Sequence, residues 1–476
     1  MSSAHLKPRT APKKWRTRLA PKLRDQRAKG TPSPWKRVRR LLLSWWPWAI
    51  VAIAAVALHW WWWAAGLGVF AILCFLLTPA ERAPRFGLDH DFAVSDPGFL
   101  PTVCGATGVV MTEGNKIVVL NNGREFYPAM LEAINQAQVS ITVEAYIYWA
   151  GETGMQFAKA IAARASAGVQ VKILLDSVGS SSIGDEILEV LEGGHCQLGW
   201  YNPIRWWSME RFNHRTHRKS LIIDGTLAFT GGAGIADHWQ GNAEDPDHWR
   251  DMQIRMEGPC VVPLQSGFAH NWTQTTSELI SGEAFYPATP PAGRLPAMTI
   301  MSSPEVGSST VRTMYYLSIA CARKSIYIAN PYFIPDEVAI DLLKDARKRG
   351  VDVQIMMAGI HNDNWIARRN SVRLYGRLLE AGITLLEYRT TMMHQKTMVV
   401  DGRWATIGTT NFDNRSFSHN DENNVCVSDT EWALALQQVF FDDTPACDRV
   451  TLEAWHKRGF RERVEEIVAS LLEEQS

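Results

Sequence analysis

The sequence lacks the cysteine pattern of a disulfide framework or of a zinc site. Its 476 residues include seven cysteines, an odd number, and no two of them form a C-x-x-C pair. Disulfide-rich domains and zinc modules both depend on paired, closely spaced cysteines. We therefore predict buried free thiols in a reducing compartment. The cysteines are Cys74, Cys104, Cys196, Cys260, Cys321, Cys426 and Cys447.

The chain also lacks a net charge, but its charges are unevenly distributed. Lysine and arginine total 49, as do aspartate and glutamate. Residues 1–40 contain 14 basic side chains and one acid, Asp25, so the remainder is net negative. A nuclease domain usually has a basic face, which argues against nucleic acid as the main partner of the folded part. Because residues 1–40 show no apolar periodicity, we predict that they are disordered.

A long apolar run follows this basic segment. From Leu41 to Leu77 the only polar residues, apart from glycines, are Ser44 and His59. The run is nearly twice the roughly 20 residues that one membrane span needs. Glycines lie a little past its middle, and tryptophans cluster near its start and its middle, where interfacial aromatic belts would lie. We predict a transmembrane hairpin of two short spans over residues 41–78.

The alternatives to this hairpin are a single tilted helix and a re-entrant hairpin. A signal peptide is disfavoured because the run is too long and has no convincing cleavage site. In the hairpin, the basic N-terminus and Arg82 and Arg85 would all face the cytoplasm, as the positive-inside rule prefers. We therefore expect a multi-pass protein of the cell inner membrane with a cytoplasmic catalytic domain.

From about residue 100 the sequence alternates between strand and helix patterns, which is typical of an α/β fold. Helices are expected at Gly154–Ala167 and Asp336–Arg349. The expected strands form two sets, which are Ile117–Leu120, Ser140–Ile147, Val169–Leu175 and Ser220–Ile223, and then Ser325–Ala329, Val351–Met357, Thr384–Glu387 and Thr397–Val400.

These two sets belong to an internal repeat. Ser140–Tyr146 is similar to Ser325–Tyr332, and Gly168–Ile173 is similar to Gly350–Ile355. Repeats of this kind indicate duplicated structural units. We predict two mixed-sheet α/β halves, residues 100–280 and 305–476, related by a pseudo-two-fold. The proline-rich stretch at 281–304 is expected to be a linker.

Each half contains the same chemical motif, H-x-K-x4-D, followed by a glycine-containing turn. The first is His217, Lys219 and Asp224, with Gly231 seven residues after the aspartate. The second is His394, Lys396 and Asp401, with Gly408 in the matching place. Two such motifs at equivalent positions of a repeat are very rare by chance. These residues are therefore the candidate catalytic set.

The spacing suits phosphodiester chemistry. Residues i and i+2 of a strand project to one face, so each histidine would lie beside its lysine. Two such pairs meeting across a two-fold would form a pocket in which lysines stabilise the phosphate charge. One imidazole would attack phosphorus, and the other would protonate the leaving alkoxide. A divalent cation would be repelled by the lysines, and His214 is expected in a loop and not at a zinc site.

The paired motifs resemble the signature of the phospholipase D superfamily. Thr216–Lys219, Asn330–Asp336 and Gly408–Phe417 are similar to the bacterial cardiolipin synthase branch, and the resemblance covers about residues 100–470. It implies a duplicated phospholipase D-like fold and phosphatidyl transfer through a phosphohistidine, without a cofactor. It also implies that His217 is the nucleophile and His394 the general acid. The expected substrates are phosphatidylglycerol and, as a possible donor, phosphatidylethanolamine.

The resemblance also suggests supporting residues. Phosphate contacts are expected from Asn411, Thr409 and Gly232. In the first half, the position that matches Asn411 is Gly234, which predicts an asymmetric site. Glu422 and Asp251 are the expected acids that hold the histidines in one tautomer. Asp224 and Asp401 follow strands at turns into glycine, so we expect them to hold the turns or to pair with a basic residue.

Weaker features have two interpretations each. Trp206 and Trp207 would line an acyl-chain entrance or belong to a core. An arginine cluster, Arg368, Arg369 and Arg373, would bind lipid headgroups or simply face solvent. Leu452–Leu472 is expected to be an amphipathic helix that packs on the domain.

Two other functions stay open at this point. One is a phospholipase D or phosphodiesterase that uses water, including a nuclease. The other is an inactive, membrane-tethered lipid-binding protein, which the two intact His–Lys pairs disfavour.

Overall fold

The computed structural model describes residues 44–57, 60–77, 92–204, 213–303 and 309–471. The segment predicted to be disordered, residues 1–40, lies outside this part of the chain, as do Arg82 and Arg85. The chain divides into two units, residues 1–90 and residues 91–476.

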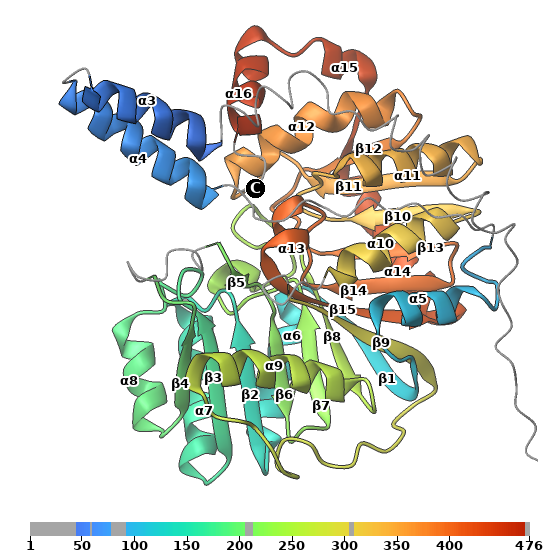
Figure 1. Cartoon of the computed structure of the whole chain (residues 1–476). Helices are drawn as coiled ribbons and strands as arrows, with labels where there is room; N and C mark the ends of the chain where they lie inside the picture. Colours follow the sequence, from blue (N-terminus) through green and yellow to red (C-terminus); the bar gives the residue numbers. More distant parts are fainter. Residues whose placement is uncertain (1–43, 58–59, 78–91, 205–212, 304–308, 472–476) are drawn as a thin grey trace, which may run out of the picture. The chain divides into compact units, whose positions relative to one another are not determined.

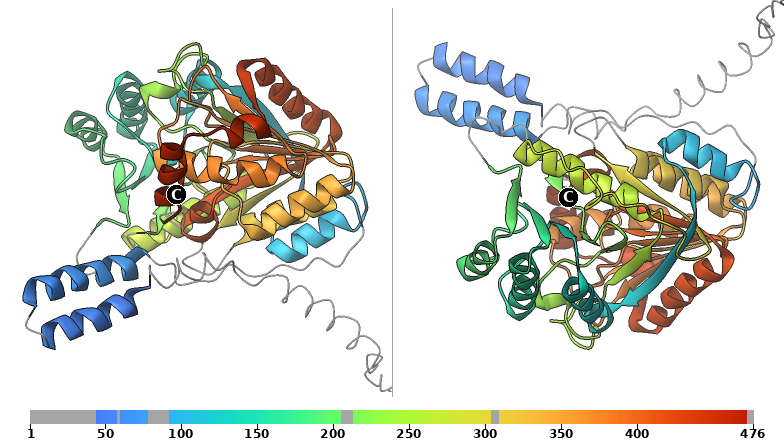
Figure 2. Two further views of the ribbon diagram at one scale, coloured as in Figure 1. Left: turned by 90° about the horizontal axis from the view of Figure 1, so that it is seen from above. Right: turned by 90° about the horizontal axis from the view of Figure 1, so that it is seen from below.

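The described part of the first unit is a pair of helices, α3 (Trp45–Ala57) and α4 (Trp61–Leu77). They lie side by side in every view (Figures 1 and 2). The ring of Trp48 meets that of Phe70 edge-on, with centroids 4.9 Å apart. The two helices therefore pack against each other, as a hairpin would. Within the described residues, however, no helix combines the length and hydropathy needed to cross a membrane.

The second unit contains one sheet of 16 strands, with helices on both faces (Figure 1). Its first eight strands are β1 (Thr112–Asn121), β2 (Ser140–Ala145), β3 (Gln170–Asp176), β4 (Gln197–Tyr201), β5 (Arg215–Thr216), β6 (Ser220–Ile223), β7 (Leu227–Gly231) and β8 (Met252–Glu257). The other eight are β9 (Leu295–Ser302), β10 (Ser325–Ala329), β11 (Asp352–Ala358), β12 (Thr384–Tyr388), β13 (Thr397–Val400), β14 (Trp404–Gly408), β15 (Asn420–Ser428) and β16 (Cys447–Val450). Strands β6, β10 and β13 begin and end at the predicted residues.

The strand order shows the duplication directly. Outward from the centre of the sheet, the first half runs β1-β8-β7-β6-β2-β3-β4 and the second runs β9-β15-β14-β13-β10-β11-β12. The two central strands, β1 and β9, are antiparallel. Strands β2–β4 and β10–β12 pair in parallel, whereas the inner strands are antiparallel, so each half is mixed. An approximate two-fold between β1 and β9 therefore relates the halves.

The helices follow the same repeat. In the first half they are α6 (Asn122–Gln136), α7 (Glu152–Ser166), α8 (Asp185–Gly193) and α9 (Val261–Thr276). Their counterparts in chain order are α10 (Thr310–Cys321), α11 (Glu337–Lys348), α12 (Trp365–Leu379) and α14 (Thr430–Asp443). The additional helices are α5 (Phe99–Thr107), α13 (Asn414–Ser418), α15 (Leu452–His456) and α16 (Phe460–Leu471).

The predicted linker needs a correction, because residues 295–302 of segment 281–304 form β9. This strand pairs with both β1 and β15 and lies at the centre of the sheet. Its signal was obscured by Pro296, which cannot donate to a ladder. The β1–β9 register is irregular in this stretch, so the proline is accommodated at an interruption of the pairing.

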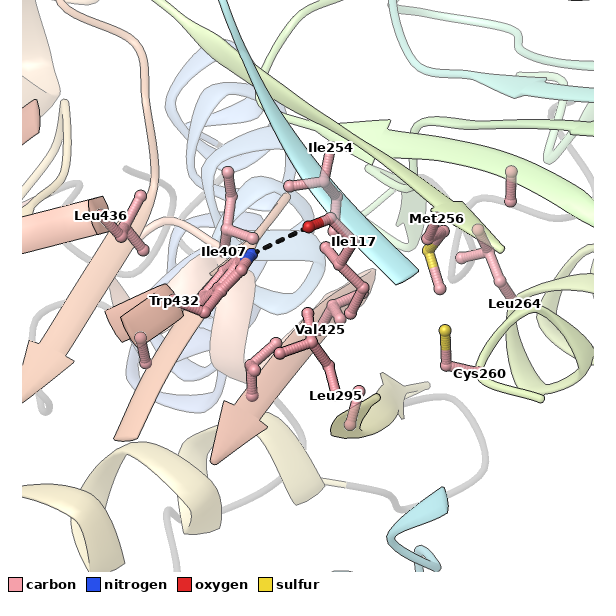
Figure 3. Close-up of a cluster of buried hydrophobic side chains, with 14 of the residues drawn as sticks. Ile117, Ile254, Met256, Cys260, Leu264, Leu295, Ile407, Val425, Trp432 and Leu436 are labelled. Carbon is pink, nitrogen blue, oxygen red and sulfur yellow. Dashed lines mark hydrogen bonds between the residues drawn. The ribbon is translucent and has the colours of Figure 1, made fainter. Parts of the chain in front are cut away.

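The two halves share a hydrophobic core, shown in Figure 3. Ile117, Ile254 and Leu264 contribute to it from the first half, and Val425 and Leu436 from the second. The indole N–H of Trp432 donates to the carbonyl oxygen of Ile117 over 3.1 Å, which links α14 to β1. Because apolar residues of both halves are buried against each other, the halves form one folding unit.

Candidate active site

The two His–Lys pairs lie at the entry to equivalent strands. His217 and Lys219 directly precede β6, and His394 and Lys396 directly precede β13. The expectation of a shared face requires that each pair continues its strand, but the hydrogen-bonded ladders begin only at Ser220 and Thr397, in agreement with the predicted strand bounds. All four residues of β6 and of β13 are buried, so the pairs are attached to a rigid core.

Each catalytic segment is anchored on the opposite half. Strand β5 pairs with the start of β15, and the backbone N–H of His217 donates to the carbonyl oxygen of Asp421 over 2.9 Å. The backbone N–H of His394 donates to the carbonyl oxygen of Arg250 over 2.7 Å. Asp421 and Arg250 each precede one of the two predicted acids. These backbone contacts therefore bring each histidine beside an acid of the other half.

The side chain of each histidine also contacts an acid of the other half. Nδ1 of His217 lies 2.9 Å from Glu422, and Nδ1 of His394 lies 2.9 Å from Asp251. Both carboxylates are fully buried. With Nδ1 protonated and donating to a carboxylate, Nε2 of each neutral ring holds the lone pair. The sequence predicted both acids, but it did not show that each one serves the histidine of the other half.

Both acids stay ionised in spite of their burial. Burial alone would raise the pKa of Glu422, but the charge and hydrogen bond of His217 outweigh it, and that pKa is lowered. The pKa of Asp251 is lowered in the same way by His394 and Lys396. Burial lowers the pKa of His217 to about 4, against the opposing effect of Glu422. Burial, with the charge of Lys396, also lowers the pKa of His394. Both imidazoles are therefore neutral near pH 7, and a neutral imidazole is the form that can attack phosphorus.

The two lysines have lowered pKa values, mainly because both are buried. Burial and the charge of Lys396 lower the pKa of Lys219 to about 7. Burial lowers the pKa of Lys396 to about 8. Nζ of Lys219 lies 3.0 Å from the carbonyl oxygen of His217, and Nζ of Lys396 lies 3.0 Å from the ring nitrogens of His394. The charge of Lys396 also lowers the pKa of His217, so the two His–Lys pairs interact electrostatically. A bound anion between them would further favour the charged form of both lysines.

Asp224 and Asp401 serve the backbone. Asp224 accepts the backbone N–H groups of Gln138, Val139 and Ser140, which lead into β2. Asp401 accepts the three N–H groups at 323–325, which lead into β10. Both aspartates have a positive φ, 50° and 56°, in the turns after β6 and β13. The motif aspartate therefore fastens the turn that follows the His–Lys strand to the start of its neighbour.

Two predicted phosphate contacts need correction. The hydroxyl of Thr409 donates to Glu422, so this threonine positions the acid. The backbone N–H of Gly232 donates to the carbonyl oxygen of Met252 over 3.1 Å and is not available to a ligand. A side chain at position 232 would collide with Asp251, since a Cβ there would lie 2.1 Å from the carboxylate. Gly232 is thus the residue that lets Asp251 approach.

The predicted asymmetry has a steric cause. Asn411 is buried, and its Oδ1 has no hydrogen-bond partner in the described residues. At the matching position, a Cβ on Gly234 would lie 2.9 Å from the Cβ of Ile147 and 3.0 Å from its carbonyl oxygen. No side chain fits there without a shift of β2 or the segment after it. The amide of Asn411 therefore has no counterpart in the first half.

Three aromatic residues of the site were not predicted. The ring of Tyr146 lies 5.0 Å from that of His217, and the ring of Tyr332 lies 6.5 Å from that of His394. Both tyrosines end the repeated segments, so a signal for them was present in the sequence. The indole N–H of Trp239 donates to Asp251 over 2.8 Å. Trp239 lies in a short 3-10 turn at 237–239, and no local pattern points to it.

The weaker predictions have mixed outcomes. Trp206 and Trp207 lie outside the described residues. Arg368 pairs with Glu387 at 2.7 Å, and Arg369 pairs with Glu465 at 2.7 Å, so neither simply faces solvent. His214 lies 5.9 Å, ring to ring, from His419. The described residues contain no group of three or more His, Cys, Asp or Glu that could hold a metal ion. The six cysteines with described side chains are free, and four of them are buried.

Comparison with known proteins identifies the family. A family model described as cardiolipin synthase, phospholipase D-like domain, matches residues 130–244 and 317–444, about half of the chain. The chain belongs to the cardiolipin synthase family of phospholipase D-like proteins. Each matched segment contains one H-x-K-x4-D motif, so the family match follows the duplication seen in the sheet.

Individual cardiolipin synthases are similar over most of their length. Cardiolipin synthase 2 of Staphylococcus epidermidis is 31% identical over 366 residues, which are 76% of this chain and 75% of that protein. The major cardiolipin synthase of Bacillus subtilis is 33% identical over 367 residues, which are 76% of each protein. The crystal structure of phosphatidylserine synthase from Haemophilus influenzae has the same fold, with a TM-score of 0.60 at 15% identity. The match covers 78% of this chain and all of that one.

Proposed function

We propose that this protein is a phosphatidyl transferase that makes cardiolipin from phosphatidylglycerol. The observation that supports this most directly is a pair of buried histidine–carboxylate hydrogen bonds between the two halves, His217 with Glu422 and His394 with Asp251. Two neutral imidazoles beside two buried lysines form a site for one phosphodiester. The curated relatives that carry the name cardiolipin synthase support the same reaction.

The first step transfers the phosphatidyl group to the protein. Nε2 of His217 attacks phosphorus, and the bond from phosphorus to the glycerol oxygen breaks. The negative charge of the bound phosphate favours a proton on His394, which gives that proton to the departing alkoxide, and glycerol leaves. Lys219 and Lys396 stabilise the charge on the non-bridging oxygens. The choice of His217 as nucleophile follows the order usual in the superfamily.

The second step releases cardiolipin. The free hydroxyl of a second phosphatidylglycerol attacks phosphorus, while the now neutral His394 takes its proton. The bond to His217 breaks, and the product lipid leaves. Water is far more abundant than any lipid, so the acceptor must succeed through orientation. Well-aligned groups reach effective molarities of about 10⁵ M or more, which is sufficient.

Product analysis tests this function. The purified full chain is incubated with vesicles of phosphatidylglycerol labelled in both its acyl chains and its headgroup. We expect cardiolipin and free glycerol in equal amounts. Phosphatidic acid as the main product would show that water is the acceptor, and the protein would then be a phospholipase D. Adding phosphatidylethanolamine shows whether it also serves as a donor, because labelled ethanolamine would then be released.

We further propose that helices α3 and α4 anchor the protein in the cell inner membrane as a hairpin. Most of their described side chains are apolar and many are exposed, including Ile53 and Trp62 at 70% and 92%. Such exposure is unfavourable in water but not in lipid. The basic N-terminus and the catalytic unit would both be cytoplasmic. Reporter fusions at Ser2 and Ser476 should both report the cytoplasm, and opposite sides would contradict the hairpin.

A further inference from the structure

Helix α16 packs on the catalytic unit through its polar face. Its neighbour is α12, and the two lie side by side in Figure 1. The amide of Asn370 donates to the carbonyl oxygen of Ala469 over 3.1 Å, and Arg369 pairs with Glu465 at 2.7 Å. Glu466, Ala469 and Ser470 are buried in this contact. The sequence predicted one amphipathic helix over Leu452–Leu472, but the structure has two helices there, α15 and α16. An amphipathic helix that packs on a domain would normally turn its apolar side inward. The structure shows the opposite orientation.

The outward face of α16 is an apolar stripe formed by Phe460, Val464, Ile467 and Val468. These side chains are 84%, 40%, 53% and 49% exposed. At about 100° per residue, their positions fall within an arc of roughly 100° on one side of the helix. Single exposed apolar side chains are normal on a soluble protein, but four on one helix face form a patch that needs a partner.

Charges around this apolar stripe favour an anionic surface. On the same helical projection, Arg461 and Arg463 lie at the two edges of the stripe, and both are exposed. The acids of the helix face the protein more than the stripe, since Glu462 and Glu465 both pair with Arg369 and Glu466 pairs with Arg458. Glu465 also pairs with Arg461 at 3.0 Å, so Arg463 is the border arginine without a carboxylate partner among the described ion pairs. An apolar stripe bordered by arginines is typical of a helix that lies in the interface of a phospholipid bilayer.

The apolar stripe of α16 is connected through α12 to the loop beside Tyr332 and His394. The residues of α12 that α16 contacts lie one turn from Trp365, the first residue of α12, which is 49% exposed. Two residues earlier, Asp363 accepts a hydrogen bond from the hydroxyl of Tyr332, the tyrosine beside His394. Ile360, in the same loop, is 79% exposed. Exposed apolar side chains thus occur both on α16 and on the loop next to the catalytic histidine.

We propose that the apolar stripe of α16, together with Trp365 and Ile360, is a membrane-docking surface that rests in the headgroup region of an anionic phospholipid bilayer. It would hold the catalytic unit in one orientation, with the His394 side of the site toward the lipid. The choice of a bilayer as occupant rests on the proposed function, in which both substrates are membrane lipids. This contact is separate from the proposed membrane anchor formed by α3 and α4.

Lipid photocrosslinking tests this surface without depending on catalysis. The full chain is reconstituted in vesicles that contain a phosphatidylglycerol with a photoreactive group near its headgroup, and crosslinked peptides are mapped by mass spectrometry. We expect adducts in residues 460–471 and 360–365, with the α3–α4 hairpin as an internal positive control. Labelling of the hairpin without labelling of α16 would overturn the proposal. A crosslink that joins α16 to a second copy of the chain, in place of a lipid adduct, would also overturn it.

Kinetics of a matched pair of variants provide the second test. In Val464→Ser/Val468→Ser, both changes are on exposed positions, so folding should be preserved. Leu434→Ser, at a 46% exposed position on α14, is the control. Full burial of one aliphatic side chain changes an equilibrium by about tenfold or more. Because Val464 and Val468 are only 40% and 49% exposed, each should contribute about threefold, so we expect activity on vesicles to fall about five- to tenfold in the double variant and to be unchanged in the control. Activity on dispersed short-chain phosphatidylglycerol should be the same in all three proteins.

These two substrates separate the possible failures. Equal activity of the double variant and the wild type on vesicles would contradict the docking surface while leaving the transferase intact. Loss of activity on both substrates by the double variant alone would show that α16 supports the site structurally, which would also contradict the proposal. If the wild type forms no cardiolipin from either substrate, the proposed function fails, and photocrosslinking alone decides the docking surface.

Discussion

At the scale of single residues, the site combines ionised acids, neutral imidazoles and buried lysines with lowered pKa values. The buried carboxylates of Glu422 and Asp251 each accept a hydrogen bond from a neutral histidine, and Lys219 and Lys396 supply positive charge nearby. The lysines do not have equally close carboxylates. Their lowered pKa values express the free energy that burial of a cation costs in the absence of substrate. Substrate phosphate would release that cost, which favours binding of an anion over binding of a neutral lipid.

The first prediction concerns Lys219. Its pKa of about 7 in the folded protein lies below the value near 10.5 expected for the unfolded chain. Between these values the unfolded chain binds more protons, so stability should rise with pH from about 7 to 10.5. Lys219→Met should remove the contribution of Lys219 to this rise, leaving that of Lys396, and increase the unfolding free energy near pH 7 by about 1–4 kcal/mol, while transfer is lost. Melting temperatures of the full chain in detergent, measured from pH 7 to 10, check this.

Lys172 is the matched control for Lys219. It is equally buried, but its Nζ lies 2.7 Å from Glu278. Lys172→Met leaves that carboxylate without its partner and should lower the melting temperature. If Lys219→Met also lowers it, the ammonium of Lys219 is fully compensated in the free protein, and the electrostatic description of the site is wrong.

At the scale of secondary-structure elements, the motif aspartates fasten neighbouring strands. Each accepts hydrogen bonds from three backbone N–H groups at the start of β2 or β10, which would otherwise lack an acceptor. The cost of losing such an acceptor is similar to that of losing a helix cap, about 0.5–2 kcal/mol, and more where several donors depend on it.

The second prediction follows from this role. Asp224→Ala should lower the unfolding free energy by about 2–3 kcal/mol, since alanine removes the acceptor and also tolerates the positive φ poorly. Asp224→Asn keeps one oxygen and suits that backbone conformation, so it should cost less. Activity per folded molecule should stay within about threefold of wild type in Asp224→Asn. A stable Asp224→Asn protein that has lost turnover would instead give the carboxylate a catalytic role.

The sequence predicted many elements well because their patterns were local. Strands β6, β10 and β13 are short apolar runs between clear turns, and they were found with their bounds. Strand β9 was missed because Pro296 and the prolines before it resemble a linker, while the pairing that stabilises it comes from β1 and β15. The amphipathic pattern of α16 was recognised, but its orientation depends on Arg369 and Asn370 of α12, which no local pattern contains.

At the scale of the whole molecule, the duplication matters because neither half contains a complete site. The paired motifs identified His217, Lys219, His394 and Lys396 from sequence alone. The sequence could not show that Glu422 and Asp251 each contact the histidine of the other half, because this depends on the pairing of β5 with β15 and of residue 250 with residue 393. The shared core around Trp432 and Ile117 fixes this arrangement, so a shift between the halves would separate both histidine–carboxylate pairs at once.

The central claim is that a histidine of one half, held by an acid of the other, carries the phosphatidyl group between two lipids. The most direct test is to mix the purified full chain with labelled phosphatidylglycerol, to quench within the first turnover under conditions that preserve a phosphorus–nitrogen bond, and to map the label by mass spectrometry. We predict a phosphatidyl adduct on His217 in the wild type and none in His217→Ala, which should also have lost nearly all turnover. An adduct on His394 would reverse the roles of the two histidines, and cardiolipin formation at the full rate in His217→Ala would contradict the mechanism altogether.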